Sequence, residues 1–282
     1  MSTLFEPSPV LNCKDCGGHG YTIGRDKAHA KAIQCSCVPA CTRCDGDGRI
    51  QVVKNGISRI GRCRCQKLPD RIRLFNLAGI PNFHGGSSLQ NFDPTPPGAG
   101  MAQRVCSSWA NSYGKGKEKK GLVLSGRVGR GKTHLLVGLI KVLIFEHGRA
   151  VKFIEFSRLL SMLREGYSRG KSDAELLGAL ADAPILAIDE LGKGRLTDWE
   201  LAIIDDVISR RYNTEGTLLA TTNYKWSAAS GMSAPNLAVT DYTQQNLGDR
   251  VGPRVFSRLQ EMCKYYAVGG DDYRNTQEQI AR

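Results

Sequence analysis

The chain has 282 residues, of which 41% are apolar and 23% charged, an ordinary balance for a globular protein that excludes wholesale disorder. This length allows one large domain or two smaller ones. Lys and Arg number 39 against 27 Asp and Glu, a formal charge of +12. An excess this basic suggests an acidic partner, most often nucleic acid, although a charge spread over the surface for solubility explains it equally well.

The beginning of the chain lacks the apolar region of a secretory signal. The longest helical apolar stretch, residues 135–145, carries Lys141 and is shorter than the roughly 20 residues of a membrane span. We therefore expect a cytoplasmic protein with no membrane contact. In that compartment close cysteine pairs bind metal more often than they form disulfides.

Eight of the ten cysteines form a tandem repeat near the N-terminus. Each copy reads C-x-x-C, then 18 residues, then C-x-C, and the two copies are offset by 28 positions. Four thiolates at this spacing predict a tetrahedral Zn²⁺ site closed by a β-hairpin, so two zinc ions are expected. In the second copy, residues 49–53 and 57–62 are the expected strands, joined by a turn at Asn55-Gly56. The candidate ligands are Cys13, Cys16, Cys35, Cys37, Cys41, Cys44, Cys63 and Cys65.

The sequence leaves the pairing of these cysteines open. Pairing within each copy is favoured because each repeat then closes its own site. The glycine-rich C-x-x-C knuckles also resemble those of DnaJ-type zinc domains, which imply a nested pairing with Cys13, Cys16, Cys63 and Cys65 on one ion. Disulfides and a catalytic dithiol are the least favoured readings. Cys106 and Cys263 lie outside the repeat and are expected to be ordinary buried thiols.

Composition divides the chain into three parts. Residues 1–69 hold the cysteine repeat and little apolar material, so we expect them to need metal to fold. Residues 70–100 are rich in Pro and Gly, and the stretch from 66 onward is predicted to be a connector with little regular structure. From 101 to 282 apolar strands alternate with helical patterns, which predicts a mostly parallel α/β sheet. The expected elements are a helix over 133–146 and strands over 122–126, 151–156, 185–189, 218–223 and 264–268.

A phosphate-binding loop lies between the first of these strands and the helix. Residues 126–133 fit G-x-x-x-x-G-K-[ST], a motif whose glycines let backbone N–H groups wrap around phosphate. Lys132 is expected to reach the β and γ phosphates of ATP, and the Thr133 hydroxyl to ligate Mg²⁺. The expected nucleotide contacts are Gly126, Val128, Gly129, Arg130, Gly131, Lys132, Thr133 and His134.

Further polar residues follow other predicted strands. Asp189 ends a buried strand and is expected to hold Mg²⁺, and Glu190 to orient and deprotonate the attacking water. Asn223 ends another strand, where an amide could position that water. Arg254 and Arg258 share one helix face, so an arginine could reach the γ-phosphate in a neighbouring subunit, or form a solvated basic face.

With these motifs in place, residues 70–276 resemble the AAA+ ATPases of the bacterial DnaC/DnaI helicase-loader family, and are also close to the IstB transposition helpers. The stretches that carry the resemblance are AGIPNFHGGSSLQNF (78–92), SGRVGRGKTHLLVGLI (125–140), ILAIDELG (185–192), LTDWE (196–200), SRRYN (209–213), TTN (221–223), RVFSRLQEMC (254–263) and DDYR (271–274).

This resemblance implies a P-loop AAA+ core and assigns further roles. Asp189 and Glu190 become the Walker B pair, and Asn223 becomes sensor 1. Arg258 matches the arginine finger that acts on a neighbouring subunit, with Arg254 as its companion, and Arg274 matches the sensor 2 arginine. Only 24 residues follow Arg258, too few for a helical lid of three or four helices at about 11 residues each.

Residues 157–181 stand where loaders carry an extra helical insertion that touches single-stranded DNA. A solvated helix face explains this segment equally well. Its candidate DNA contacts are Arg158, Arg164, Tyr167, Arg169 and Lys171.

The resemblance therefore predicts an ATP-dependent, self-assembling loader that delivers a hexameric, DnaB-type replicative helicase onto single-stranded DNA. Its zinc module would grip the helicase, as in DnaI-like loaders. Two tandem four-cysteine sites depart from that family, so a DNA- or initiator-binding role for the module stays open. The alternatives are an IstB-like helper of a DNA transposase, and a zinc-dependent nucleic-acid-binding adaptor that uses ATP as a switch.

Overall fold

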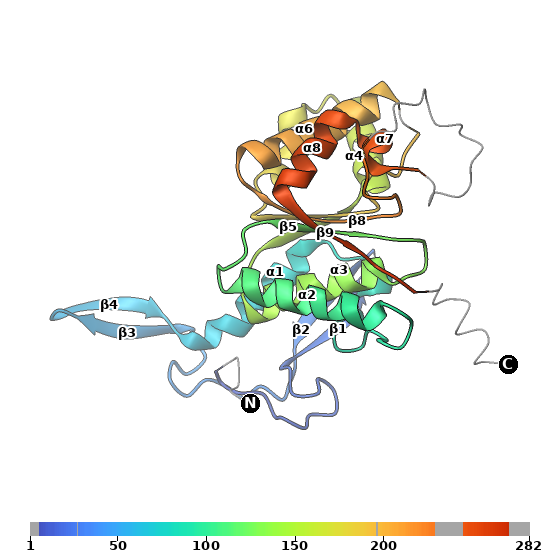
Figure 1. Ribbon diagram of the computed structural model, residues 1–282. Coiled ribbons are helices and arrows are strands. Elements are labelled where there is room, and N and C mark those ends of the chain that lie inside the picture. The colour runs from blue at the N-terminus through green and yellow to red at the C-terminus, as the bar shows by residue number, and fades with distance from the viewer. Residues whose placement is uncertain (1–5, 27, 196, 229–244, 271–282) are drawn as a thin grey trace. The chain divides into compact units, whose positions relative to one another are not determined.

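A computed structural model describes residues 6–26, 28–195, 197–228 and 245–270, and the chain divides into two compact units (Figure 1). Unit 1 comprises residues 1–86 together with 144–148, and unit 2 comprises 87–143 and 149–282. The expected boundary at residue 69 lies inside a helix of unit 1, and the two units divide instead after residue 86.

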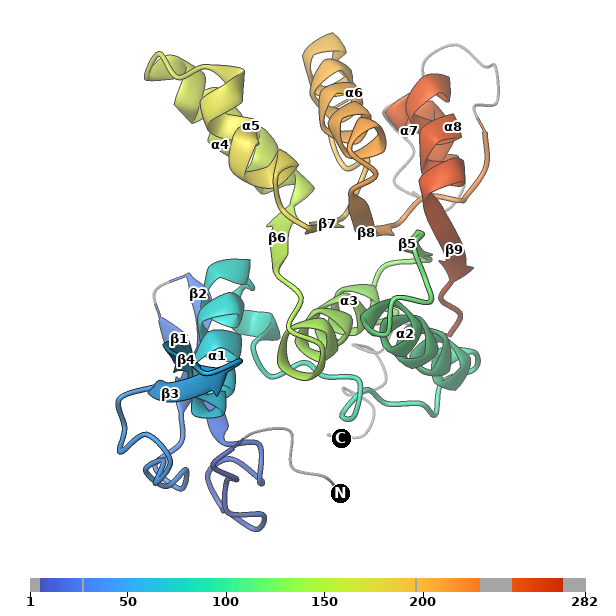
Figure 2. The ribbon, with the colours of Figure 1, turned by 90° about the vertical axis from the view of Figure 1, so that its left-hand side faces the viewer.

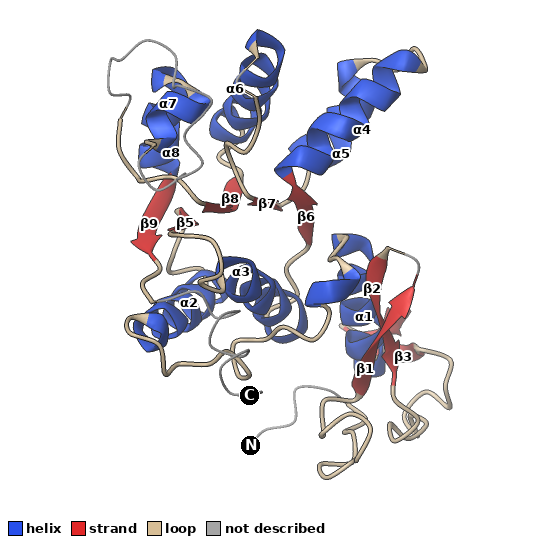
Figure 3. Cartoon of the chain, turned by 90° about the vertical axis from the view of Figure 1, so that its right-hand side faces the viewer, coloured by secondary structure: helices blue, strands red, loops and turns tan. Residues whose placement is uncertain are grey.

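Unit 1 contains one antiparallel hairpin for each cysteine repeat, drawn as red arrows in Figure 3. The first pairs β1 (Tyr21–Asp26) with β2 (His29–Gln34), and the second pairs β3 (Arg49–Lys54) with β4 (Ile57–Arg62). The predicted second hairpin is confirmed. Its turn residues have φ of 52° at Asn55 and 74° at Gly56, the positive values that a tight hairpin turn requires.

Residues 66–100 are more regular than the sequence suggested. After the short η1 (Arg64–Gln66) comes helix α1 (Lys67–Ala78), and η2 (Asn82–His84) follows it. The prediction of little regular structure is wrong at α1. Pro69 is tolerated because it lies in the first turn, where the backbone N–H has no partner within the helix. Gly79, at φ 82°, ends the helix.

Helix α1 covers the first hairpin. The Asn76 side chain accepts from Ala32 N at 2.7 Å and donates to Ala32 O at 3.0 Å, so it pairs with the edge of β2 as another strand would. Ala30 and Ala32 are buried, whereas nearly every residue of β3 and β4 is exposed. The two repeats thus share a sequence pattern but differ in burial.

Unit 2 is built on a parallel sheet of five strands in the order β6-β7-β8-β5-β9, which confirms the predicted α/β fold class. The observed ends lie within one residue of those expected. The strands are β5 (Gly121–Ser125), β6 (Val151–Glu155), β7 (Ile185–Asp189), β8 (Thr217–Thr222) and β9 (Cys263–Ala267).

Helices cover both faces of this sheet (Figure 2). One face carries α2 (Ala99–Gly114) and α3 (Lys132–Lys141), and η3 (Val142–Glu146) continues α3 as a π-helix. The other face carries α4 (Phe156–Ser168), α5 (Asp173–Ala181), α6 (Asp198–Asn213), α7 (Leu247–Val251) and α8 (Pro253–Met262). Within the described ranges, no helix is both long and apolar enough to cross a bilayer.

Candidate nucleotide site and metal centres

The phosphate-binding loop, residues 126–131, joins β5 to α3. Three of its glycines have positive φ, with values of 147° at Gly126, 82° at Gly129 and 74° at Gly131. A Cβ on Gly126 would lie 2.6 Å from Val268 O, and one on Gly131 would lie 2.6 Å from the Phe92 ring. The loop therefore needs glycine here for both conformation and space. Its path directs the first N–H groups of α3 toward the space that a phosphate would occupy.

Lys132 is the first residue of α3 and is 7% exposed. Its Nζ donates to Arg127 O at 2.7 Å, which keeps the ammonium group over the loop. Arg130 is held differently, because its Nη1 donates to Val268 O, 3.1 Å away, in the segment after β9. Lys132 thus lies inside the loop, whereas Arg130 links the loop to the segment after β9.

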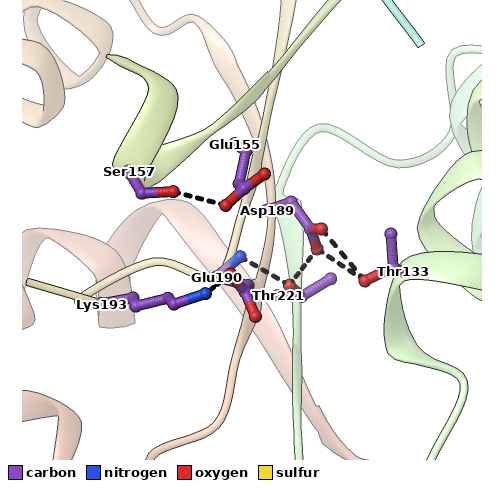
Figure 4. Close-up of polar contacts among 7 residues, drawn as sticks. All are labelled: Thr133, Glu155, Ser157, Asp189, Glu190, Lys193 and Thr221. Carbon is purple, nitrogen blue, oxygen red and sulfur yellow. Dashed lines mark hydrogen bonds and ion pairs between the residues drawn. The ribbon is translucent and has the colours of Figure 1, made fainter. Parts of the chain in front are cut away.

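Asp189 and Thr133 meet at the carboxyl edge of the sheet (Figure 4). The Thr133 hydroxyl lies 3.0 Å from both carboxylate oxygens of Asp189, and the Thr221 hydroxyl donates to Asp189 Oδ1 at 2.5 Å. Burial raises the pKa of Asp189, an effect opposed by these two hydrogen bonds and reinforced by the negative charges of Glu190 and Glu155. Two hard oxygen ligands side by side in this setting fit Mg²⁺.

Glu190 follows β7 with a φ of 57°, a left-handed value that a non-glycine residue adopts only when its surroundings hold it. Its backbone N–H donates to Thr221 Oγ1 at 2.9 Å, and its carboxylate pairs with Lys193 Nζ at 2.5 Å. Glu155 ends the neighbouring strand in register with Asp189 and accepts from Ser157 (Figure 4). No role was predicted for Thr221, Lys193 or Glu155, although each lies within four residues of the carboxyl end of a predicted strand.

Asn223 is partly buried directly after β8, which pairs with both β5 and β7. It therefore lies at the same sheet edge as the loop and Asp189, where the sequence placed it. Its neighbour Thr222 donates to Leu191 O at 2.9 Å, which fixes the segment after Glu190 against the end of β8.

Arg258 and Arg254 both lie on α8 and face α6, but differ in exposure. Arg258 is 18% exposed, donates to Asp205 Oδ1 at 3.1 Å and also to the Ser209 hydroxyl, and stacks over the Tyr212 ring at 5.5 Å. Arg254 is 71% exposed and lies 3.8 Å from the same carboxylate. In the structure Arg258 is thus bound within its own subunit. Arg274 lies outside the described residues.

Arg250 has a role that the sequence did not show. It is 4% exposed, donates to Gly192 O at 3.0 Å and Gly194 O at 2.5 Å, and lies 4.9 Å over the Tyr224 ring. It therefore holds the loop that follows Glu190. The two backbone carbonyl groups that it binds explain the burial of this arginine.

The candidate DNA contacts lie on α4 and in the short segment that joins α4 to α5. Arg164 donates to buried Glu200 at 3.1 Å, and Arg169 pairs with Glu165 at 2.6 Å. Tyr167 meets the Trp199 ring edge-on at 6.4 Å. Three of the five expected contacts thus take part in packing or ion pairs within the chain, while Arg158 and Lys171 are exposed.

A pocket of about 100 Å³ adjoins the phosphate-binding loop and was not foreseen. His134 meets the Phe92 ring edge-on at 5.4 Å, and His134 Nε2 lies 2.9 Å from Ser88 O and 3.0 Å from Asn91 Oδ1. The pocket is partly apolar and suits the base of a nucleotide whose phosphates lie in the loop. Its lining residues are Asn91, Phe92, Asp93, Pro96, Ala99, Arg130, Gly131, His134 and Gly269.

The eight repeat cysteines of unit 1 gather into two clusters of four, Cys13, Cys16, Cys35 and Cys37 in one, and Cys41, Cys44, Cys63 and Cys65 in the other. Pairing is therefore within each repeat, and the nested alternative is wrong. Each hairpin brings the C-x-C that follows its second strand back to the C-x-x-C that precedes its first.

The sulfur geometry fits Zn²⁺. Four thiolates at about 2.3 Å from one zinc ion lie about 3.8 Å apart in a tetrahedron. The Cys13–Cys35 and Cys16–Cys37 sulfurs are 3.8 and 3.5 Å apart, and the matching distances in the second cluster are 3.7 and 3.5 Å. Gly20 N and Gly48 N each donate to a cysteine sulfur at 3.3 Å, which supports the negative charge of a thiolate.

The two cysteines outside the repeat are buried thiols, as expected. Burial raises the pKa of both Cys106 and Cys263 to about 12, so neither is a reactive thiolate at neutral pH.

Comparison with known proteins identifies the family. The IstB-like ATP binding protein family matches residues 75–281. The chain belongs to this family. It is 26% identical over 205 residues to the replicative helicase loader DnaC of Escherichia coli K12, covering 72% of this chain and 75% of DnaC. It is 27% identical over 241 residues to the phage-like element PBSX protein XkdC of Bacillus subtilis, covering 81% of each.

Solved structures agree. A crystal structure of the DnaC helicase loader matches with a TM-score of 0.54 and 27% identity, covering 66% of this chain and 99% of that one. A structure of DnaI matches in fold, with a TM-score of 0.51 and 20% identity over 68% of this chain and 93% of that one. Unit 2 is therefore an AAA+ ATP-binding core of the DnaC type, and the resemblance seen in the sequence is confirmed.

Proposed function

We propose that this protein is an ATP-dependent loader that delivers a hexameric replicative helicase onto single-stranded DNA. The observation that carries the proposal is the match to the DnaC helicase loader, which spans 99% of that solved structure at 27% identity. The proposed partners, a DnaB-type helicase and DNA, place its action in the bacterial cytoplasm.

The proposed ATPase chemistry uses residues that the fold brings to one sheet edge. Lys132 and the loop N–H groups bind the β and γ phosphates, while the pocket beside Phe92 takes the base. Thr133 and Asp189 would hold Mg²⁺, which supplies charge neutralisation at the phosphates. Glu190 accepts the proton of the attacking water, and Asn223 orients that water.

Assembly completes the proposed site. Arg258 matches the arginine that reaches the γ-phosphate bound by a neighbouring subunit, with Arg254 beside it and Arg274 as sensor 2. Arg258 must leave Asp205 to do so. Hydrolysis would therefore respond to oligomerisation.

Lys132→Ala tests the nucleotide site. We expect loss of ATP binding, measured with a fluorescent ATP analogue, while the zinc content stays unchanged. Lys115→Ala, an exposed lysine just after α2, is the matched control. Normal ATP hydrolysis by Lys132→Ala would overturn the site assignment.

Helicase capture tests the partner. Full-length, zinc-loaded protein should retain a replicative helicase on an affinity column and raise its unwinding of DNA already coated with single-strand binding protein. The family description favours one second candidate, an ATPase helper of a DNA transposase. Capture of a transposase but not of a helicase would support that second candidate instead.

We propose that each cysteine cluster holds one Zn²⁺, which stabilises the hairpin around it. In the loader the zinc module contacts the helicase. Metal analysis of purified protein should return about two zinc ions per chain, one for each four-thiolate site. A disulfide-bonded, zinc-free protein would contradict this assignment.

A further inference from the structure

The second zinc hairpin carries a basic surface to which the proposed helicase contact assigns no residue. The basic ribbon consists of strands β3 and β4 with their turn, residues 49–62 (Figure 1). It is exposed along nearly its whole length. Its cations are Arg49, Lys54, Arg59 and Arg62, and residues 48–69 contain no Asp or Glu. The exposed fractions of Val52 and Ile57, 42% and 55%, are too high for core positions, and both side chains share a face with Lys54 and Arg59.

A basic pocket lies where the ribbon meets α1. It has a volume of about 410 Å³, and five of its lining residues are cationic, Arg62, Arg64, Lys67, Arg71 and Arg73, against one acidic residue, Asp70. Arg62 pairs with Asp70 at 2.9 Å, and Arg64 lies 3.8 Å from Glu6. By formal charge, the pocket lining thus carries four more cationic than acidic residues.

Neutralisation of the zinc–thiolate centre explains only part of this charge. A Zn²⁺ ion with four thiolates carries a net charge of about −2, which cations near Cys63 offset. Lys54 and Arg59 lie toward the opposite end of the ribbon, since Lys54 pairs with Ile57 at the turn and Arg59 with Val52. The zinc centre therefore does not account for these two charges.

We propose that the basic ribbon and basic pocket bind double-stranded DNA. The ribbon enters the major groove with Lys54 and Arg59 on the flanking phosphates, and the pocket binds the neighbouring phosphate backbone. A two-stranded ribbon fits a groove about 12 Å wide. Val52 and Ile57, on the same face as Lys54 and Arg59, provide apolar contacts of the kind that thymine methyl groups accept. The ribbon has no aromatic residue, which disfavours both base stacking on single strands and the aromatic anchors of protein interfaces.

The test compares Lys54→Gln/Arg59→Gln with Lys115→Gln/Lys117→Gln, an exposed pair near the end of α2 that removes the same charge from unit 2. Binding of full-length, zinc-loaded protein to a labelled DNA duplex and to a single strand is measured by fluorescence anisotropy over a salt series. For the ribbon variant we expect about tenfold weaker duplex binding and a salt slope smaller by about 2, one unit per lost phosphate contact. Single-strand binding should change little.

Three results would overturn the proposal. The first is an equal loss of duplex binding by both double variants, and the second is unchanged duplex binding by the ribbon variant. The third is a ribbon variant that loses helicase capture but keeps duplex binding. Lys67→Gln/Arg73→Gln tests the basic pocket independently and should lower the salt slope in the same way. Zinc content verifies folding of each variant. Lys132→Ala should retain duplex binding, so failure of the ATPase assignment and failure of this inference give different results.

Discussion

Asp189 illustrates at the scale of one residue how a functional group can destabilise its own fold. Burial raises its pKa, so the ionised form needed for Mg²⁺ is disfavoured in the folded chain. Below the ordinary carboxyl pKa of about 4, Asp189 is protonated in the folded and unfolded states alike and costs no stability. The penalty grows as the pH rises from there to the raised pKa, and it is constant above the raised pKa.

Asp189→Asn should therefore stabilise the protein in the absence of nucleotide and abolish Mg²⁺-dependent hydrolysis. For each kcal/mol of destabilisation that the substitution removes, we expect the melting temperature at neutral pH to rise by about 2–4 °C. The gain should shrink as the pH falls toward 4, because the wild-type carboxyl group then becomes protonated. Scanning calorimetry over a pH series measures this, and a gain that does not depend on pH would contradict the explanation.

Arg258 and Arg254 form a second comparison at this scale, because they share a helix and a carboxylate partner but differ in exposure. Arg258→Ala should leave nucleotide binding intact and lower assembly-stimulated hydrolysis by about 10³-fold. Arg254→Ala should have a smaller effect. Turnover assays at rising protein concentration distinguish them, and equal loss of nucleotide binding would instead make Arg258 a structural residue.

At the scale of an element, α1 acts as the third component of the first hairpin. Asn76 supplies both the donor and the acceptor that Ala32 would otherwise lack. Asn76→Ala should cost about 1–3 kcal/mol of stability, because a buried backbone group loses its partner. The rate at which a chelator removes zinc should rise. Leu77→Ala, at a 59% exposed position of the same helix, should leave that rate unchanged.

The elements also show what the sequence could and could not predict. A phosphate-binding loop and a 28-residue cysteine offset depend on local spacing, so the strands, the hairpin and the metal-ligand groups were predicted within a residue or two. Helix α1 was missed because the prediction for residues 66–100 followed their Pro and Gly content, although Leu68, Phe75 and Ala78 recur at helical spacing before Gly79. The pocket beside Phe92 and the carbonyl contacts of Arg250 depend on residues distant in sequence, which a pattern search cannot bring together.

At the scale of the whole molecule, two compact units suggest two separable stabilities. Removal of zinc should unfold unit 1, whose hairpins depend on their thiolate clusters, while unit 2 keeps its own buried core and its affinity for ATP. Circular dichroism before and after chelation measures the folding of unit 1, and nucleotide titration measures the affinity of unit 2 for ATP. Simultaneous loss of both would show that the units fold as one.

The exposed turn at Asn55-Gly56 has a practical consequence. Its two residues close a ribbon that contributes almost nothing to the buried core, while the cysteines that anchor the ribbon lie at its other end. A fluorophore or short peptide epitope inserted between them should leave metal retention intact. The same turn thus offers an attachment point from which the position of unit 1 on a partner could be followed by energy transfer.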